Sequence, residues 1–196
     1  MFKNILNEFR ISCIVTISFA IVLCGVYPSA VWIIAHSIFP AKANGSLVSV
    51  NNRVVGSSLL GQPFSGPGYF HPRPSAAGQG YDASNSGGSN LGPTSQRLID
   101  IVKTRIDRYR DENYLNSDIN IPADAVTASA SGLDPHISIE NARLQASRVA
   151  NNRGLKKETV LEMINTRTEG RTMWIFGEPR VNVLLLNMDL NAIKDK

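Results

Sequence analysis

The chain begins with one long apolar run and continues with shorter alternations of apolar and polar residues. Between Arg10 and Lys42 there is no Asp, Glu, Lys or Arg, and apolar residues dominate from Ile11 to Phe39. A bilayer core of about 30 Å needs roughly 20 apolar residues of helix. The pattern therefore predicts a leader over residues 1–10, a transmembrane helix over residues 11–39 and one soluble domain over residues 40–196.

A secretory signal peptide is the alternative interpretation of this run, with residues 41–43 (AKA) as its cleavage site. The apolar stretch is about twice as long as the 7–15 residues typical of a signal peptide, which favours an uncleaved anchor. Lys3 and Arg10 before the run nearly balance Lys42 and Arg53 after it. Because a short leader before a first span favours a cytoplasmic N-terminus, we expect a periplasmic soluble domain.

Small residues recur every four positions in the first half of the run. They form one stripe along the predicted helix, made of Ser12, Thr16, Ala20 and Cys24. Small side chains let a second transmembrane helix approach closely, so the stripe is a predicted partner interface; chance is the alternative. Further along, Pro28 predicts a kink.

The start of the soluble domain has the pattern of a β-hairpin followed by a long loop. Two β-rich runs, Ser46–Val50 and Arg53–Ser57, flank Asn51-Asn52, and Asn tolerates the positive φ of a tight hairpin turn. Residues 63–95 are rich in Gly, Pro, Ser and Asn. Large apolar residues are nevertheless spaced through the stretch: Phe64, Tyr69, Phe70, Tyr81 and Leu91. Since a flexible linker needs no such groups, we predict an ordered, packed loop.

The rest of the chain has helical periodicity and then short strand-like runs. A helix is predicted to begin at Thr94 or Ser95. A second begins at its cap Ser138 and ends near Gly154, and a third covers about Lys157 to Thr168. Two strands are then predicted over Met173–Phe176 and Val181–Leu186. The expected fold class is α+β: a single N-terminal transmembrane helix followed by one small mixed α/β soluble domain.

The composition and motifs of the soluble domain do not favour an active site. The formal net charge of the chain is +4, without the clustered basic residues that nucleic acid needs. The two histidines of the predicted soluble domain, His71 and His136, show no HxH or HExxH spacing, and Asp82, Asp124 and Asp134 are the nearby candidates. Glycines near Ser86 suggest a phosphate loop, but no GxxxxGK[ST] pattern is present. We therefore expect no catalytic residues and no metal site.

Several long motifs nevertheless resemble a known family over nearly the whole chain. These motifs are Gly56–Gln62, Tyr69–Ala76, Tyr81–Ser95, Pro122–Ser138 and Gly177–Val183. In this order they resemble the C subunits of the bacterial Kdp potassium-transporting P-type ATPases, the KdpC family. The resemblance implies a non-catalytic accessory subunit of a high-affinity, ATP-driven potassium import complex in the bacterial inner membrane. The implied partners are a channel-like potassium-binding subunit, an ATP-hydrolysing P-type subunit and a small single-span subunit.

The resemblance also implies candidate nucleotide contacts. The family subunit is described as a catalytic chaperone that raises the ATP affinity of the hydrolysing subunit. By this likeness, Gln145 and the segment Ser86, Gly87 and Gly88 are candidate nucleotide-binding residues. No cofactor is expected to bind stably, and ATP only through the hydrolysing subunit. Gln145 also lies next to the predicted inward face of its helix, which predicts a buried, hydrogen-bonded amide.

A periplasmic location would keep the domain away from ATP. We therefore expect the stripe to dock on the channel-like subunit, and the loop over residues 63–95 to cap the extracellular mouth of its pore and stabilise the assembly. Two other classes stay open, namely a membrane-anchored periplasmic hydrolase that uses His71 or His136, and a free-standing sensor domain.

Overall fold

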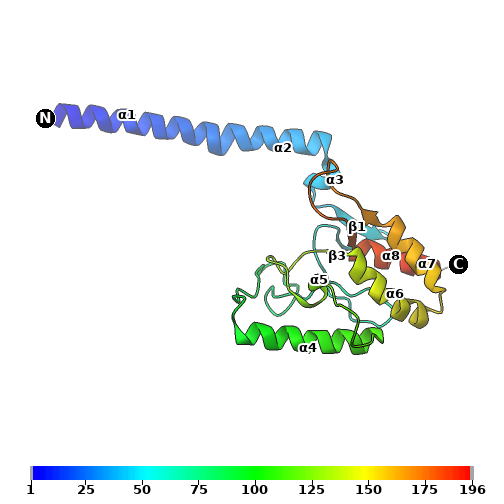
Figure 1. The fold of residues 1–196 in the computed structure, drawn as a ribbon. Helices are drawn as coiled ribbons and strands as arrows, with labels where there is room; N and C mark the ends of the chain where they lie inside the picture. The colour runs from blue at the N-terminus through cyan, green and yellow to red at the C-terminus, as the bar shows by residue number, and fades with distance from the viewer. Residues whose placement is uncertain (1, 195–196) are drawn as a thin grey trace. The chain divides into compact units, whose positions relative to one another are not determined.

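The structure, a computed structural model, describes residues 2–194 and separates into two compact units, Met1–Leu47 and Val48–Lys196 (Figure 1). The first unit is mainly helix: α1 (Phe2–Ala20), the π-helical segment η1 (Ile21–Val26), α2 (Tyr27–Ile38) and the short α3 (Pro40–Ala43). Within it, Asn4–Ile38 is long and apolar enough to cross a membrane. The structure therefore contains the single N-terminal apolar helix that the sequence predicts.

The apolar helix changes its winding just before Pro28. The π-helical turns of η1 end at Val26, and Pro28 lies in the first turn of α2. Proline has no backbone N–H, and its ring clashes with the carbonyl four residues earlier in a regular α-helix. A wider π turn is a common way to accommodate such an interruption. The structure therefore shows altered winding before Pro28, and the predicted kink stays a prediction.

The C-terminal unit, Val48–Lys196, begins within a two-stranded hairpin. Strands β1 (Leu47–Val50) and β2 (Arg53–Ser57) pair with each other. Asn51 and Asn52, which join them, both have positive φ, at 49° and 61°. This is the turn in which Asn is favoured over most residues, and it confirms the predicted hairpin.

A second sheet in this unit is three-stranded and antiparallel, in the order β3-β5-β4. Its strands are β3 (His136–Ser138), β4 (Thr168–Glu169) and β5 (Arg180–Asn182). The main core is formed by buried side chains of this sheet and of α6 (Ile139–Arg153), α7 (Lys157–Thr166) and α8 (Val183–Lys194). The mixture of helices and small sheets confirms the α+β class.

A smaller cluster forms around α4 (Gln96–Asn113) and α5 (Ala123–Val126). Here Tyr109, Ala125 and Val126 are buried. Ser95 takes the N-cap position of α4 as predicted, although its side chain makes no capping bond. Ser138 does cap α6, since its hydroxyl accepts a hydrogen bond from the Asn141 N–H, and Gly154 ends that helix in the left-handed conformation. Both ends of α6 are therefore confirmed.

Two of the predicted strands are wrong. Met173–Phe176 forms a tight exposed turn closed by a bridge between Thr172 and Phe176. In Val181–Leu186, only the first two residues belong to β5, and α8 begins at Val183. Buried residues at 183, 186, 187 and 190 have the 3.6-residue period of a helix. An apolar run of six residues is too short to distinguish the period of a helix from the alternation of a strand.

Candidate functional site

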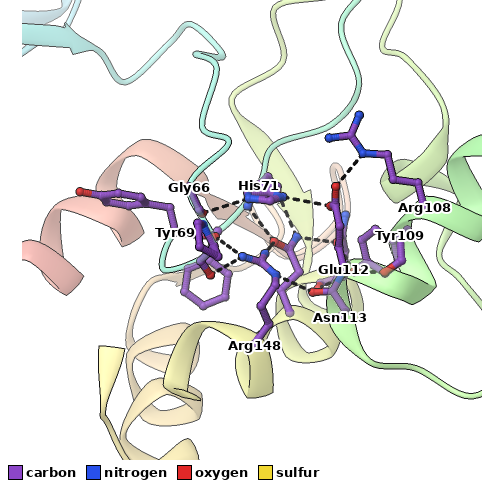
Figure 2. A network of polar contacts seen from close by, with 12 residues as sticks. Gly66, Tyr69, His71, Arg108, Tyr109, Glu112, Asn113 and Arg148 are labelled. Atoms are coloured by element: carbon purple, nitrogen blue, oxygen red, sulfur yellow. Dashed lines mark hydrogen bonds and ion pairs between the residues drawn. The ribbon is translucent and has the colours of Figure 1, made fainter. Parts of the chain in front are cut away.

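The most extensive polar cluster of the C-terminal unit surrounds Gln145 on α6. We call it the Gln145 network and define it by Gln145 and the residues bonded around it: His71, Tyr109, Glu112, Asn113, Asn141 and Arg148 (Figure 2). The Gln145 side chain is 1% exposed. Its oxygen accepts bonds from the His71 N–H (2.7 Å) and the Arg148 guanidinium (2.8 Å). Its nitrogen donates to the His71 carbonyl (3.1 Å) and to Asn141 Oδ1 (2.8 Å).

These four bonds use the full capacity of the Gln145 amide, which has two donors and two acceptor lone pairs. The prediction of a buried, hydrogen-bonded amide is therefore confirmed. The nearby Asn187 side chain likewise bonds to both backbone groups of one residue. Its oxygen accepts from the Phe70 N–H (2.8 Å), and its nitrogen donates to the Phe70 carbonyl (2.9 Å). Two buried amides thus hold the backbone of consecutive residues, Phe70 and His71.

Arg148 lies one turn after Gln145 and is 2% exposed. Its guanidinium donates to Asn113 Oδ1 (2.9 Å), to the Pro67 carbonyl (2.6 Å) and to the Tyr69 carbonyl (2.9 Å), besides Gln145. Burial lowers the pKa of Arg148, and the Glu112 carboxylate opposes this effect. The rigid fork of the guanidinium suits several fixed acceptors at once, so one side chain ties the loop to α4 and α6.

His71 is the member of the network that borders a hollow. Its Nε2 lies 3.1 Å from the Gly66 carbonyl and its Nδ1 lies 3.5 Å from Glu112. Burial lowers the pKa of His71, and the positive charge of Arg148 lowers it further. The imidazole is therefore neutral at pH 7 and cannot serve as a cationic site at that pH.

The hollow has a volume of about 370 Å³. It is lined by loop residues and by α4, α5 and α6: Pro63, Phe64, Ser65, His71, Pro72, Pro74, Ser75, Tyr81, Arg105, Arg108, Tyr109, Glu112, Ala125, Asn141 and Gln145. Its two arginines are engaged, Arg105 with the Val126 carbonyl (3.0 Å) and Arg108 with Glu112 (2.6 Å). Burial raises the pKa of the Tyr81 hydroxyl to about 12, so this group is protonated at pH 7. The hollow thus offers neutral polar groups, the Arg108–Glu112 ion pair and the Arg105 guanidinium, which is bonded to a neutral carbonyl.

The other predicted nucleotide residues, Ser86, Gly87 and Gly88, lie elsewhere. The Ser86 hydroxyl and the Gly87 N–H both donate to the Ser131 carbonyl, each at 3.0 Å. Gly88 closely approaches the backbone of Ala130. Among the described residues that line the hollow, none belongs to this segment, so the structure does not bring it to one pocket with Gln145.

The loop over residues 63–95 is ordered and packed, as predicted. Phe70 and Ala77 are fully buried, and Tyr69, Tyr81, Phe64 and Leu91 are partly buried. The Tyr81 hydroxyl donates to the Arg73 carbonyl (2.6 Å), and the Arg153 guanidinium lies 4.4 Å from the Tyr69 ring centre. The loop is therefore a fixed part of the domain surface.

The histidine and aspartate candidates serve mainly as local hydrogen-bonding groups. Asp134 pairs with Arg73 (2.8 Å) and accepts from the His136 N–H (3.0 Å). Burial alone would raise the pKa of Asp134, but the bonds from His136 and Arg73 outweigh it and lower the pKa to about 2. Asp124 accepts bonds from Ser138 and Asn141 at the start of α6. Within residues 2–194, no three His, Cys, Asp or Glu side chains come together as a metal site.

The predicted stripe lies on the first unit, and its four side chains are exposed there. Ser12, Thr16 and Ala20 lie on regular α1, whereas Cys24 lies on η1. A shallow depression on this helix is lined by Ile17, Ala20, Ile21, Gly25, Val26 and Ser29. Because η1 changes the winding of the helix, the surface of small residues that includes Ala20 continues through Gly25 and Ser29.

Sequence reasoning missed Arg148, Asn113 and Asn187 as structural groups. Arg148 follows Gln145 by three residues, which places the two on the same side of α6. That spacing was a signal for Arg148. Asn113 and Asn187 had none, because their partners lie 35 and 117 residues away in the chain.

Comparison with known proteins gives consistent matches over most of the chain. The family described as "K+-transporting ATPase, c chain" matches residues 9–192. A KdpC subunit of Nitratidesulfovibrio vulgaris is 52% identical over 185 residues, which are 94% of this chain and 93% of that protein. The corresponding subunit of Myxococcus xanthus is 53% identical over 193 residues (97% and 89%), and that of Mycobacterium tuberculosis 47% over 175 residues (89% and 93%).

These matches, together with the apolar helix and the α+β domain, define the class as a membrane subunit of a potassium-transporting ATPase. The chain belongs to the KdpC family of such subunits.

Proposed function

We propose that this chain is a non-catalytic accessory subunit that assembles and stabilises a Kdp-type potassium import complex. Its partners would be the channel-like potassium-binding subunit, the ATP-hydrolysing P-type subunit and the small single-span subunit. The observation that supports this role is the clamped loop. The buried side chains of Gln145, Arg148 and Asn187 hydrogen-bond to the backbone of the loop over residues 63–95. The buried Asn113 in turn accepts a hydrogen bond from Arg148. A loop fixed before binding loses little conformational entropy when it docks on a partner.

In this proposal the domain lies in the periplasm, the N-terminus lies in the cytoplasm, and the loop caps the extracellular mouth of the potassium pathway. Any effect on ATP affinity then passes through the hydrolysing subunit. Gln145 would act by holding His71 in place, since its amide has no hydrogen-bonding group left for a nucleotide. The competing proposal, from family likeness, is direct nucleotide contact by Gln145 and by Ser86, Gly87 and Gly88.

Topology separates these two proposals. A single cysteine would be placed at the exposed Ser117 in a background where Cys13 and Cys24 are replaced by serine, and intact spheroplasts would be treated with a membrane-impermeant thiol reagent. We expect labelling from outside, without lysis. Labelling only after lysis would place the domain beside the ATP-hydrolysing machinery and overturn the capping role. A cysteine-free chain reports background labelling.

We further propose that the surface of small residues formed by Ala20, Gly25 and Ser29 docks the apolar helix on the channel-like subunit. Ala20→Trp is expected to reduce recovery of the partner subunits with the tagged chain at least about tenfold, because helices that meet at small residues cannot accommodate a bulky one. The matched control is Ser18→Trp, since Ser18 lies two residues away on the opposite side of regular α1. Equal recovery with both variants would contradict the docking surface.

A further inference from the structure

Four highly exposed apolar side chains of the C-terminal unit are consecutive in the sequence and lie together in one tight turn. Met173, Trp174, Ile175 and Phe176 are 74%, 93%, 73% and 63% exposed. The turn is closed at its base by paired bonds, from the Thr172 N–H to the Phe176 carbonyl (2.8 Å) and from the Phe176 N–H to the Thr172 carbonyl (2.9 Å). We call residues 173–176 the apolar tip; in Figure 1 they belong to the orange loop after α7.

The backbone of the apolar tip is held in a conformation that ordinary residues avoid. Met173 and Trp174 have φ values of 53° and 67°. A left-handed conformation is unfavourable for an L-residue with a side chain. Strain of this kind is concentrated at functional sites. Here it occurs in a turn whose four large apolar side chains are all exposed.

Two ion pairs flank the tip and neutralise its base. Arg171 pairs with Glu178 (2.8 Å), and Arg180 pairs with Glu169 (3.1 Å). The tip therefore has no excess charge that would select an acidic or a basic partner. A Trp ring next to Ile, Phe and Met, above paired charges, matches the membrane–water interface, where aromatic rings lie at the level of the lipid headgroups.

The connection to the anchor supports a lipid surface as the occupant. Only residues 39–46 separate α2 from β1, and they can span at most about 30 Å when fully extended. Within the C-terminal unit, the strand that follows the tip is tied to the end of the hairpin, because the buried Asn182 donates to the Ser58 carbonyl (2.8 Å). The end of β5, the strand after the tip, is thus bonded to the residue that follows the hairpin.

We propose that residues 173–176 insert into the interface of the bilayer that the apolar helix crosses, and so hold the domain in one orientation on the membrane surface. Removing a large apolar side chain from water is favourable. Several such side chains at partial depth are enough to keep the tip in the interface, because the covalent link to the apolar helix gives an effective concentration on the order of millimolar. This inference depends on the apolar helix spanning the membrane and is independent of the proposed capping role.

The native Trp174 makes the test direct, since the chain has only one other tryptophan, Trp32. The full-length Trp32→Phe chain would be reconstituted in phosphatidylcholine vesicles, with and without lipids brominated near the headgroup end of the acyl chains. We expect a blue-shifted emission and a roughly twofold loss of intensity with brominated lipid, because indole rings at the interface lie close to these groups. Aqueous iodide should quench weakly.

The matched control moves the reporter to Tyr114, which is 75% exposed and has a similar positive φ of 55°. In the variant Trp32→Phe, Trp174→Phe, Tyr114→Trp, iodide should quench strongly and brominated lipid should not. Three outcomes overturn the proposal: Trp174 quenched by iodide alone, Trp174 shielded from both quenchers and hence covered by protein, or equal quenching by brominated lipid at both positions.

Discussion

Replacing Arg148 with methionine is expected to lower the free energy of unfolding of the C-terminal unit by about 3–4 kcal/mol. Methionine keeps much of the volume but removes the donor to the acceptors of Asn113, Pro67 and Tyr69, and leaves the Gln145 oxygen with only the His71 N–H. Each buried acceptor left unpaired costs about 1 kcal/mol or more. Removing a charge from the interior relieves a desolvation cost, but the four lost bonds outweigh that relief because the guanidinium is well matched to its acceptors.

The measurement is urea unfolding of the full-length chain in detergent, followed by near-ultraviolet circular dichroism, which reports the aromatic loop residues. Arg143→Met is the control, since Arg143 lies on the same helix, is exposed and makes one weak bond of 3.3 Å to Asn165. We expect this control to change stability by less than about 0.5 kcal/mol. A loss for Arg148→Met no larger than that of the control would show that the Gln145 network does not support the fold.

The parts of the fold that the sequence predicted well are those with local chemical signals. The Asn51-Asn52 turn, the Ser138 cap and the Gly154 helix end each depend on the conformational preference of one or two residues. The errors fall where the signal was short or non-local. β3 and β5 have three residues each, and they pair across a separation of more than 40 residues.

The candidate site shows the same division between local and distant information. The helical spacing of α6 correctly predicted a buried amide at Gln145, because that position adjoins the inward face. The partner of this amide, the backbone of His71, lies 74 residues earlier in the chain. No local pattern connects the two. The nucleotide-contact role of Gln145 and of Ser86–Gly88 stays a prediction, since it depends on a partner subunit.

Gly132 is the residue at which a single added methyl group is expected to disturb the loop most. It has a φ of 67°. A Cβ atom at Gly132 would lie 2.6 Å from the Ala77 nitrogen and 2.7 Å from the Gly87 oxygen, both backbone atoms. The left-handed conformation costs an alanine roughly 1 kcal/mol, and forced movement of packed backbone adds about 1–3 kcal/mol. Gly132→Ala is therefore expected to destabilise the unit by about 2–4 kcal/mol.

Gly154→Ala separates the two contributions, because Gly154 has almost the same φ, 66°, and no atom within 4 Å of its Cβ position. Gly154→Ala is expected to lower the free energy of unfolding only by the cost of the left-handed conformation, about 1 kcal/mol. The difference between the two variants in urea unfolding then measures the contact of Gly132 with Ala77 and Gly87. Equal losses would mean that these segments are free to separate, and a loop that can open so easily would not be the fixed surface that capping of a partner requires.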